Sequence, residues 1–510
     1  MEGGNRPKNV NKETSNTETE TTMMMPSSSN LPFTPKGESY GADINVQFHN
    51  AATSTVSGKS APPRKPLHQE VKPESWVVPT STKAIRAVNP VTFAFSRLAD
   101  KVKLGSQRTD GKNPISLANG DPRSASDFGP CTEAMKASVH SMIRDAQQSL
   151  GYANACGVSS VRKAIAEHHS YPEHRIEARN VIVTNGCSGA LELAFNALLD
   201  PGCGVLIPQP SIPMYEMMAE SVGATVVKYK LQMDCNWECD LEFLHTAMQH
   251  CGNKIRAIVV NNPSSATGAV FSQLHIVQLL EFARIYRLPI IADEVFGDMT
   301  YAPSQFFPIA QVAAQLGRQV PVITANGLSK QLMIPGWRAG WVTFHDNVHG
   351  SLRELQAGAV RLAELGPGVS TLTQCAIPQL LSKSNEGLNG WKSRLQTSLE
   401  RQIVFLMTKL SMCDGLVPMA PQGTYYTMVK IKYSVLGMDD WEFASRLLDE
   451  ENLIVLPGSA LGAPNNAFRI SFHLPQRSLY EATTRLYNFC QRHASERREA
   501  MDTLVEFAMI

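Results

Sequence analysis

One lysine in this chain has neighbours that suit covalent catalysis. Lys330 lies in the stretch NGLSKQLMIPGWRAGW (326–341), directly after an apolar run, and Arg338 follows it eight positions later. A lysine amine attacks an aldehyde only in its neutral form, which a partly desolvated pocket or a nearby cation favours. The product of that attack is a Schiff base. The stretch therefore indicates covalent chemistry on an aldehyde, although a loop lysine taken alone is more often a solvated charge.

Pyridoxal 5'-phosphate (PLP) is the common aldehyde cofactor, and it needs an anion site for its phosphate. Gly186, Cys187 and Ser188 directly follow the β-rich run VIVT (181–184) and open a helical stretch. Backbone N–H groups at a helix N-terminus bind anions. The guanidinium of Arg338 would add a bidentate charged contact to the same phosphate.

The same cofactor needs a carboxylate against its pyridine nitrogen. Asp293 stands at the end of the apolar run PIIAD (289–293), where it would keep that nitrogen protonated. Taken alone, each of these features has a plainer explanation, such as a capped turn for NGCSGA or a turn residue for Asp293. Because they follow successive predicted strands, a shared crevice is the stronger interpretation.

These groups need a layered fold to bring them together. From about residue 180, short β-rich runs alternate with helical stretches, of which 272–287 is one example. The predicted strands are 181–184, 205–208, 225–229, 257–261, 289–293, 322–326 and 340–344. Such alternation predicts an α/β layer with a largely parallel sheet, in which the closely following last run fits an antiparallel strand. Right-handed crossovers then place most strand-end loops on one edge, where ligands bind.

Composition narrows the function classes. The chain is 43% hydrophobic and 18% charged with a net charge of +1, which gives no general attraction to nucleic acid or an anionic membrane. It has no run of about 18 apolar residues that would cross a membrane, and its N-terminus has no apolar signal core. The closest cysteine pair, Cys235 and Cys239, lacks a second pair at metal-ligand spacing. We therefore expect a cytoplasmic protein with reduced thiols and no bound metal.

Six stretches, in order along the chain, resemble the PLP-dependent class I and II aminotransferases of fold type I, specifically the tyrosine aminotransferase branch. They are ISLANGDP (115–122), GYANACG (151–157), VIVTNGCSGALEL (181–193), IIADEVFGDM (290–299), SKQLMIPGWRAGW (329–341) and AFRISFHLP (467–475). The resemblance runs from about residue 75 to about residue 490. It implies an α/β fold with a large domain on a mainly parallel seven-stranded sheet, a smaller α+β domain, and a homodimer.

The implied organisation has five parts. Residues 1–74, rich in Ser, Thr, Asn, Glu and Pro, are expected to form a disordered extension and linker. An N-terminal arm with part of the small domain follows at 75–130, and a large PLP-binding domain at 131–365. A C-terminal small domain spans 366–490, and a C-terminal helical tail spans 491–510.

Carried over position by position, the resemblance implies a role for each matching residue. Lys330 would form the Schiff base and then move the proton between the substrate α carbon and the cofactor. Asp293 would pair with the pyridine nitrogen. On the substrate side, Arg469 would bind the α-carboxylate near Gly120. The remaining cofactor contacts are Gly186, Cys187, Ser188, Arg338 and, across the dimer interface, Tyr152.

Three positions around the cofactor ring depart from the family pattern. Ser265 stands where the family has an asparagine, Phe296 where it has a tyrosine, and Ile212 where it has a ring-stacking aromatic residue. The family's asparagine and tyrosine donate to the phenolic oxygen of the cofactor. Their loss predicts a higher pKa for the Schiff base, weaker cofactor binding and slower turnover. Ser265 would be a shorter replacement donor, and Ile212 would pack on the ring by dispersion.

Three functions are compatible with this pattern. The first is a dimeric enzyme that passes the amino group of an aromatic amino acid such as L-tyrosine to a 2-oxo acid such as 2-oxoglutarate. The second is a PLP enzyme of altered reaction, namely a lyase, racemase or decarboxylase. The third is a catalytically weakened homologue that acts as a binding protein. Because Lys330, Asp293, Arg338 and Arg469 are all retained, we favour an enzyme acting on small molecules, not on nucleic acid or membranes.

Overall fold

The computed structural model describes most of the chain from residue 80 onward. The described residues are 80–87, 89–92, 94, 96–98, 111–118, 120–122, 129, 131–144, 150–251, 254–317, 320–348 and 350–508. They belong to a compact unit that begins at Val77, and the predicted extension at 1–74 lies outside the described residues. Among these residues, no helix is both long and apolar enough to cross a membrane.

A seven-stranded sheet forms the centre of this unit. Its order is β2-β8-β7-β6-β5-β3-β4, and β8 runs antiparallel to its neighbours β2 and β7 while the other pairs are parallel. The strands are β2 (Val181–Asn185), β3 (Gly204–Gln209), β4 (Thr225–Lys230), β5 (Ile255–Asn261), β6 (Ile290–Asp293), β7 (Val322–Gly327) and β8 (Ala339–His345). All seven predicted strands are present, and the predicted α/β class with a mainly parallel sheet is confirmed.

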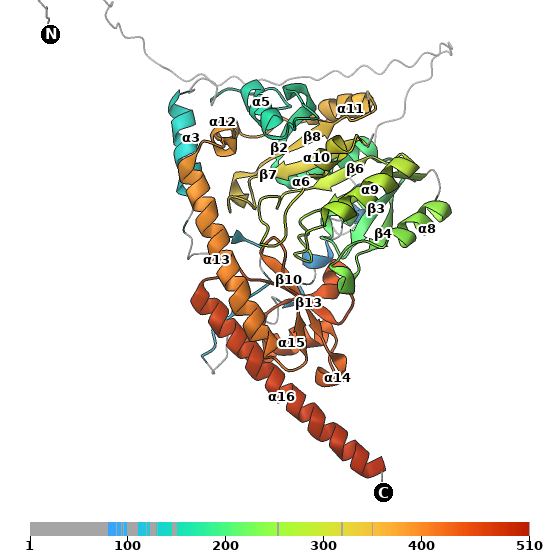
Figure 1. Ribbon diagram of the computed structural model, residues 1–510, viewed down its shortest axis with the longest axis vertical. Coiled ribbons are helices and arrows are strands. Elements are labelled where there is room, and N and C mark those ends of the chain that lie inside the picture. Colours follow the sequence, from blue (N-terminus) through green and yellow to red (C-terminus); the bar gives the residue numbers. More distant parts are fainter. Residues whose placement is uncertain are drawn as a thin grey trace, which may run out of the picture. The chain divides into compact units, whose positions relative to one another are not determined.

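Both faces of this sheet are covered, because successive side chains of a strand point to opposite faces. In β5, Ala257 and Val259 join one apolar core, whereas Ile258 and Val260 join a second. The first core is covered by α5 (Ser159–His168), α6 (Gly186–Leu198), α7 (Met214–Ser221), α11 (Arg353–Ala363) and α12 (Thr371–Leu381). The second is covered by α8 (Leu241–Cys251), α9 (Gln273–Tyr286) and α10 (Ile309–Gln315) (Figure 1).

A smaller four-stranded antiparallel sheet has the order β12-β13-β10-β9. Its strands are β9 (Leu416–Pro418), β10 (Tyr426–Ile431), β12 (Leu456–Pro457) and β13 (Ala467–Ser471). The long helices α13 (Glu386–Ser411) and α16 (Gln476–Ala508) pack against each other beside it (Figure 1). α16 continues without a break through 490/491, where the sequence suggested that a separate tail begins.

The segment around Gly120 lies with the C-terminal strands, because β1 (Ile115–Ser116) pairs in parallel with β11 (Leu453–Ile454). The short 3₁₀ helices are η4 (Ala178–Asn180), η5 (Met233–Cys235), η7 (Pro335–Trp337) and η8 (Gly458–Leu461). Further helices are α1 (Thr82–Arg86), α3 (Thr132–Arg144), α14 (Tyr433–Leu436) and α15 (Asp440–Glu451).

The parallel strands bring their carboxyl ends to one edge of the large sheet. β2 ends just before Gly186, β6 ends at Asp293, and β7 leads to Lys330. The chain just before β10 is fastened over this edge, where the N–H of Gln422 donates to the carbonyl oxygen of Gly268 at 2.9 Å. The segment that leads into the smaller sheet therefore lies at this edge.

Candidate active site

Asp293, the last residue of β6, is buried at the centre of this edge. Its Oδ2 accepts from the hydroxyl of Tyr215 at 2.5 Å, and its Oδ1 accepts from Val295 N–H at 3.2 Å and from Cys187 Sγ at 3.5 Å. Burial raises the pKa of Asp293, while these donors and the charge of Lys330 oppose the rise. A carboxylate held in this way is suited to pair with a protonated ring nitrogen away from water.

Lys330 reaches back over the same edge. Its Nζ donates to the carbonyl oxygen of Gly120 at 3.2 Å, and it lies 5.9 Å and 5.7 Å from the ring centres of Phe296 and Tyr425. The side chain is only partly exposed. The rings of Phe296, Tyr425 and Tyr426 form an aromatic wall, and the Lys330 amine lies against its first two members. The plainer interpretation of Lys330 as a solvated loop charge therefore does not hold.

The start of α6 forms another end of the site. Gly186 begins this helix with a φ of +73°, and Arg338 Nη2 donates to Asn185 O at 3.0 Å and to Ser188 Oγ at 2.9 Å. A Cβ at position 186 would lie 2.6 Å from that nitrogen, so the close approach of the guanidinium requires glycine here. A helix N-terminus and a guanidinium thus meet at one place, an arrangement that suits a phosphate.

Two further observations suit an anion site. Asn185, which precedes α6, makes no capping hydrogen bond with its side chain, so the first-turn N–H groups after Gly186, whose own N–H donates to Arg338 O at 2.9 Å, have no side-chain cap from Asn185. Ser329 Oγ is buried and has no hydrogen-bond partner within the described part of the chain. Because buried hydroxyls are normally paired, a ligand that accepts hydrogen bonds fits this place.

Arg469, on β13 of the smaller sheet, is a buried cation. Its Nη1 donates to Ser265 O at 3.0 Å, and its guanidinium carbon lies 4.1 Å from the centre of the Tyr426 ring. Its Nε has no hydrogen-bond partner among the residues that the structure describes. Burial lowers the pKa of Arg469, which shows that the protein alone solvates this charge poorly. A planar carboxylate from a ligand would supply both the missing charge and the missing acceptor.

Comparison with known proteins identifies the family that uses this arrangement. The family described as "Aminotransferase class I and II" matches residues 112–486. This chain belongs to the class I and II aminotransferases. It is 33% identical over 432 residues to the tyrosine aminotransferase of Dictyostelium discoideum, covering 84% of this chain and 99% of that protein.

Two further likenesses bear on the reaction of this aminotransferase. The S-alkyl-thiohydroximate lyase SUR1 of Arabidopsis thaliana is 30% identical over 399 residues, which cover 77% of this chain and 83% of that protein. The crystal structure of tyrosine aminotransferase from Leishmania infantum matches with a TM-score of 0.71 and 28% identity, over 82% of this chain and 99% of that one.

The residues of this aminotransferase fit PLP, the cofactor on which the family depends. The α6 N-terminus, Arg338 and the unpartnered Ser329 hydroxyl would hold its phosphate. Asp293 would face its ring nitrogen, and Lys330 would be its covalent anchor. When bound, the cofactor withdraws electrons from the α carbon of an attached amino acid. Lys330 would be the base that takes the proton that leaves that carbon.

Ser265 has a partner that the sequence did not suggest. Its Oγ donates to Asn261 Oδ1 at 2.8 Å. The same Asn261 donates from Nδ2 to the carbonyl oxygen of Asp293 at 3.1 Å. In this structure the hydroxyl proton of Ser265 is therefore bound by Asn261, and its role as a shorter replacement donor to the cofactor stays a prediction.

Phe296 and Ile212, the other two positions that depart from the family pattern, both pack against apolar groups. The Phe296 ring is buried and packs edge-to-face on the Tyr425 ring, with 5.3 Å between centres. Ile212 is half-buried and packs against the first apolar core. Phe296 brings no hydroxyl to the site, and the aromatic wall presents that of Tyr425 instead.

Cys187 and Tyr152 are placed differently from the other predicted contacts. The Cys187 side chain points to Asp293, so only its backbone N–H is left for a phosphate. Burial raises the pKa of Cys187, which keeps the thiol protonated as a donor. Tyr152 is 96% exposed, so one chain alone does not bring it into the site.

Sequence reasoning missed several residues of this site, namely Tyr215, Asn261, Ser329, Tyr425 and Tyr426. Only Ser329 had a usable signal, since it directly precedes the anchor lysine. Tyr215 is 78 positions from its partner Asp293, and Tyr425 is 305 positions from Gly120. Packing of α7 and of the smaller sheet creates these contacts.

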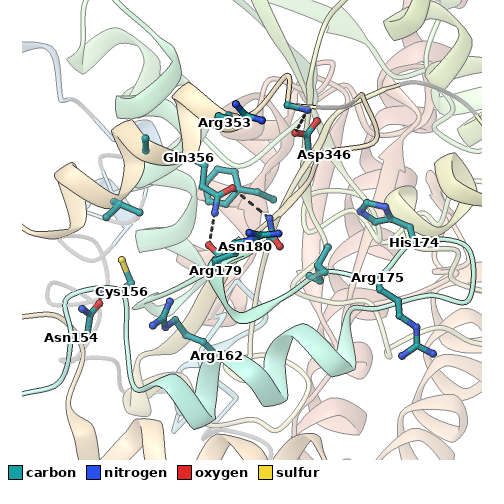
Figure 2. A pocket seen from close by; sticks show the side chains of 15 residues that line it. Asn154, Cys156, Arg162, His174, Arg175, Arg179, Asn180, Asp346, Arg353 and Gln356 are labelled. Carbon is teal, nitrogen blue, oxygen red and sulfur yellow. Dashed lines mark hydrogen bonds between the residues drawn. The ribbon is translucent and has the colours of Figure 1, made fainter.

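A second cavity, of about 700 Å³, lies at the other end of β2 (Figure 2). It is lined by Asn180, which precedes β2, and by Asp346, which follows β8. Arg162 lies on its wall, held by the carbonyl oxygens of Gly157 and Ala178 at 3.1 Å and 3.2 Å. Because β2 runs from this cavity toward Gly186, the two sites are at opposite ends of the strand.

Proposed function

We propose that this aminotransferase transfers the amino group of an aromatic amino acid such as L-tyrosine to a 2-oxo acid such as 2-oxoglutarate. The observation that carries the proposal is the aromatic wall between the cations Lys330 and Arg469. Tyr426 packs on Arg469, and its ring centre is 4.7 Å from that of Tyr425, against which Lys330 lies. A substrate whose carboxylate binds Arg469 would have its side chain beside aromatic rings, which favour an aromatic partner.

Each protein group would have one task in this reaction. Arg469 holds the α-carboxylate through parallel N–H donors and so fixes the α carbon in place. Lys330 Nζ would take the proton that leaves the α carbon of the substrate and would carry it to the cofactor. Asp293 would hold the ring nitrogen in its protonated form, which is what lets the cofactor withdraw electrons. The tyrosine aminotransferases among the relatives support the same donor class.

A lyase reaction is the second candidate, because one observation favours it. Phe296 removes a hydroxyl from the ring surroundings, and one relative is named as a lyase. Both reactions begin with loss of a proton from the α carbon. The two reactions differ in which group of the substrate is released after that proton.

Nitrogen labelling separates the two candidates. The PLP-loaded protein is incubated with ¹⁵N-labelled L-tyrosine and 2-oxoglutarate, and the products are identified by mass spectrometry. Transamination puts the label into glutamate. A parallel reaction with an S-alkyl cysteine and no 2-oxo acid should release little ammonium. Rapid release of ammonium there, with no labelled glutamate from tyrosine, would favour the lyase.

We propose further that the active enzyme is a homodimer in which Tyr152 completes the site of the other subunit. Its 96% exposure leaves it free for that contact. Mixing Lys330→Ala and Tyr152→Phe subunits tests this directly. Refolded mixtures should regain up to about a quarter of wild-type activity, because half of the subunit pairs then contain one intact site. Mixtures no more active than the two variants would contradict a shared site.

A further inference from the structure

The carbonyl oxygen of Gly120 accepts two hydrogen bonds within the candidate active site. Lys330 Nζ donates to it at 3.2 Å, and the Tyr425 hydroxyl donates at 3.4 Å. A carbonyl oxygen has two lone pairs, so it can serve both donors at once. The amine of the anchor lysine and one phenol are thus linked through a single backbone atom.

The Tyr425 ring is held firmly in this position. It is fully buried and lies edge-to-face with Phe296, while its centre is 4.2 Å from that of His473 and 4.7 Å from that of Tyr426. Its backbone carbonyl accepts from Phe472 N–H at 3.0 Å. The hydroxyl therefore has little freedom to turn away from Gly120.

We propose that Tyr425 is a positioning residue for Lys330, and that it acts through the carbonyl oxygen of Gly120, to which both side chains donate. The proposal rests on the assignment of Lys330 as the anchor of an aminotransferase.

Two states of Lys330 explain what Tyr425 does. When the amine is free, it donates to Gly120 O beside the Tyr425 hydroxyl. When the nitrogen is bound covalently and moves away, Tyr425 keeps the buried carbonyl paired. Without Tyr425, the carbonyl would accept more strongly from a protonated nitrogen and would retain the amine.

The surrounding charges keep Tyr425 a donor. Burial, with further effects of Tyr426 and Asp121, raises its pKa well above the ordinary value, and Arg469 opposes this only in part. Burial lowers the pKa of His473 to about 4, so its imidazole is neutral at physiological pH. Tyr425 therefore stays protonated at any pH at which the enzyme works.

The test is Tyr425→Phe in the full-length, PLP-loaded protein. The first readout is the pH titration of the visible absorbance of the bound cofactor, which needs no substrate. We expect its midpoint to rise by about one pH unit. We also expect kcat for L-tyrosine to fall about tenfold with KM changed less than about threefold, since Tyr425 acts through Lys330 and not on the carboxylate.

Tyr229→Phe is the matched control, because it removes another buried phenol, which donates to Val259 O at 2.7 Å in the second core. It should lower Tm without moving the absorbance midpoint. An unchanged midpoint in Tyr425→Phe overturns the proposal.

Two outcomes separate this proposal from the proposed function. If tyrosine is not a substrate, the absorbance midpoint still shifts in Tyr425→Phe, and only the donor assignment fails. If Tyr425→Phe does not fold, 3,5-difluorotyrosine incorporated at position 425 serves as the test. This more acidic phenol donates more strongly to the carbonyl oxygen of Gly120 and should lower the absorbance midpoint. An unchanged midpoint would contradict the proposal.

Discussion

The hydroxyl of Tyr215 donates to Asp293 Oδ2 at 2.5 Å, and both side chains are buried. This hydrogen bond favours the charged form of Asp293, which burial disfavours. Because Asp293 is expected to hold a protonated ring nitrogen, Tyr215 determines how well the site holds the cofactor. A residue of α7 thereby controls the electrostatics at the end of β6.

Tyr215→Phe should weaken cofactor binding. Without this donor the pKa of Asp293 rises further, so less of the carboxylate is charged at neutral pH. The apparent Kd for PLP, followed by fluorescence quenching, should increase about tenfold and more steeply below neutral pH. An unchanged Kd would show that Cys187 and Val295 suffice to keep Asp293 charged.

Lys330→Ala should leave a folded protein without covalent cofactor attachment. The side chain is partly exposed and makes one hydrogen bond, to Gly120, so its loss removes little packing. We expect turnover to fall by about 10²–10⁴-fold, as for loss of a general acid–base group. Tm should stay close to that of wild type. Turnover near the wild-type rate would show that another group moves the α proton.

Arg469→Lys should impair carboxylate binding selectively. Lysine keeps the charge but loses the planar pair of donors. KM for L-tyrosine should rise about tenfold or more, whereas the much slower reaction of tyramine, which has no carboxylate, should change little. Equal loss for both compounds would place Arg469 outside the carboxylate site.

Gly120→Ala should disturb the aromatic wall. A Cβ at this position would lie 2.6 Å from the Tyr426 hydroxyl, and Tyr426 is almost fully buried. The ring must move away from Arg469, at a cost of about 1–3 kcal/mol in unfolding free energy. Denaturant unfolding and KM for L-tyrosine measure the two effects. Neither would change if the Tyr426 ring could shift freely.

Glu294 gives a pH dependence of stability that is separate from catalysis. Burial raises its pKa to about 8, while its Oε1 accepts from Ile309 N–H at 2.8 Å at the start of α10. Because the folded-state pKa is raised, this contribution is complete below the ordinary value near 4.5 and is lost as pH rises through about 8. In the cofactor-free protein, Glu294→Gln keeps the acceptor and removes the titration. Its Tm advantage over wild type should therefore grow from pH 5 to pH 9, and parallel curves would contradict this.

Residue type and strand-end position were enough to predict the α/β fold and to single out Lys330 and Asp293. Arg469 was singled out only by the resemblance to the family. The partner of Asp293 was not predictable, because the position of Tyr215 depends on how α7 packs on the sheet. The hydrogen bond from Ser265 to Asn261 was not predictable either, because the direction of a hydroxyl depends on its neighbours.

The extent of the site beyond one subunit stays a prediction. Tyr152 lies in a stretch that resembles the family, but its side chain is exposed in the single chain. The suggested domain boundaries at 130/131 and 365/366 also stay predictions. The contact of Lys330 with Gly120 joins the N-terminal arm to the large sheet, and no local pattern in the sequence signals it.

The absorbance of the PLP-loaded protein during a half-reaction tests the central claim most directly. The loaded protein should absorb in the visible or near ultraviolet, and excess L-tyrosine alone should convert that band to the band of the amine form of the cofactor. Addition of 2-oxoglutarate should then restore the first spectrum. A band that L-tyrosine leaves unchanged, or a conversion that 2-oxoglutarate does not reverse, would contradict transamination between these two substrates.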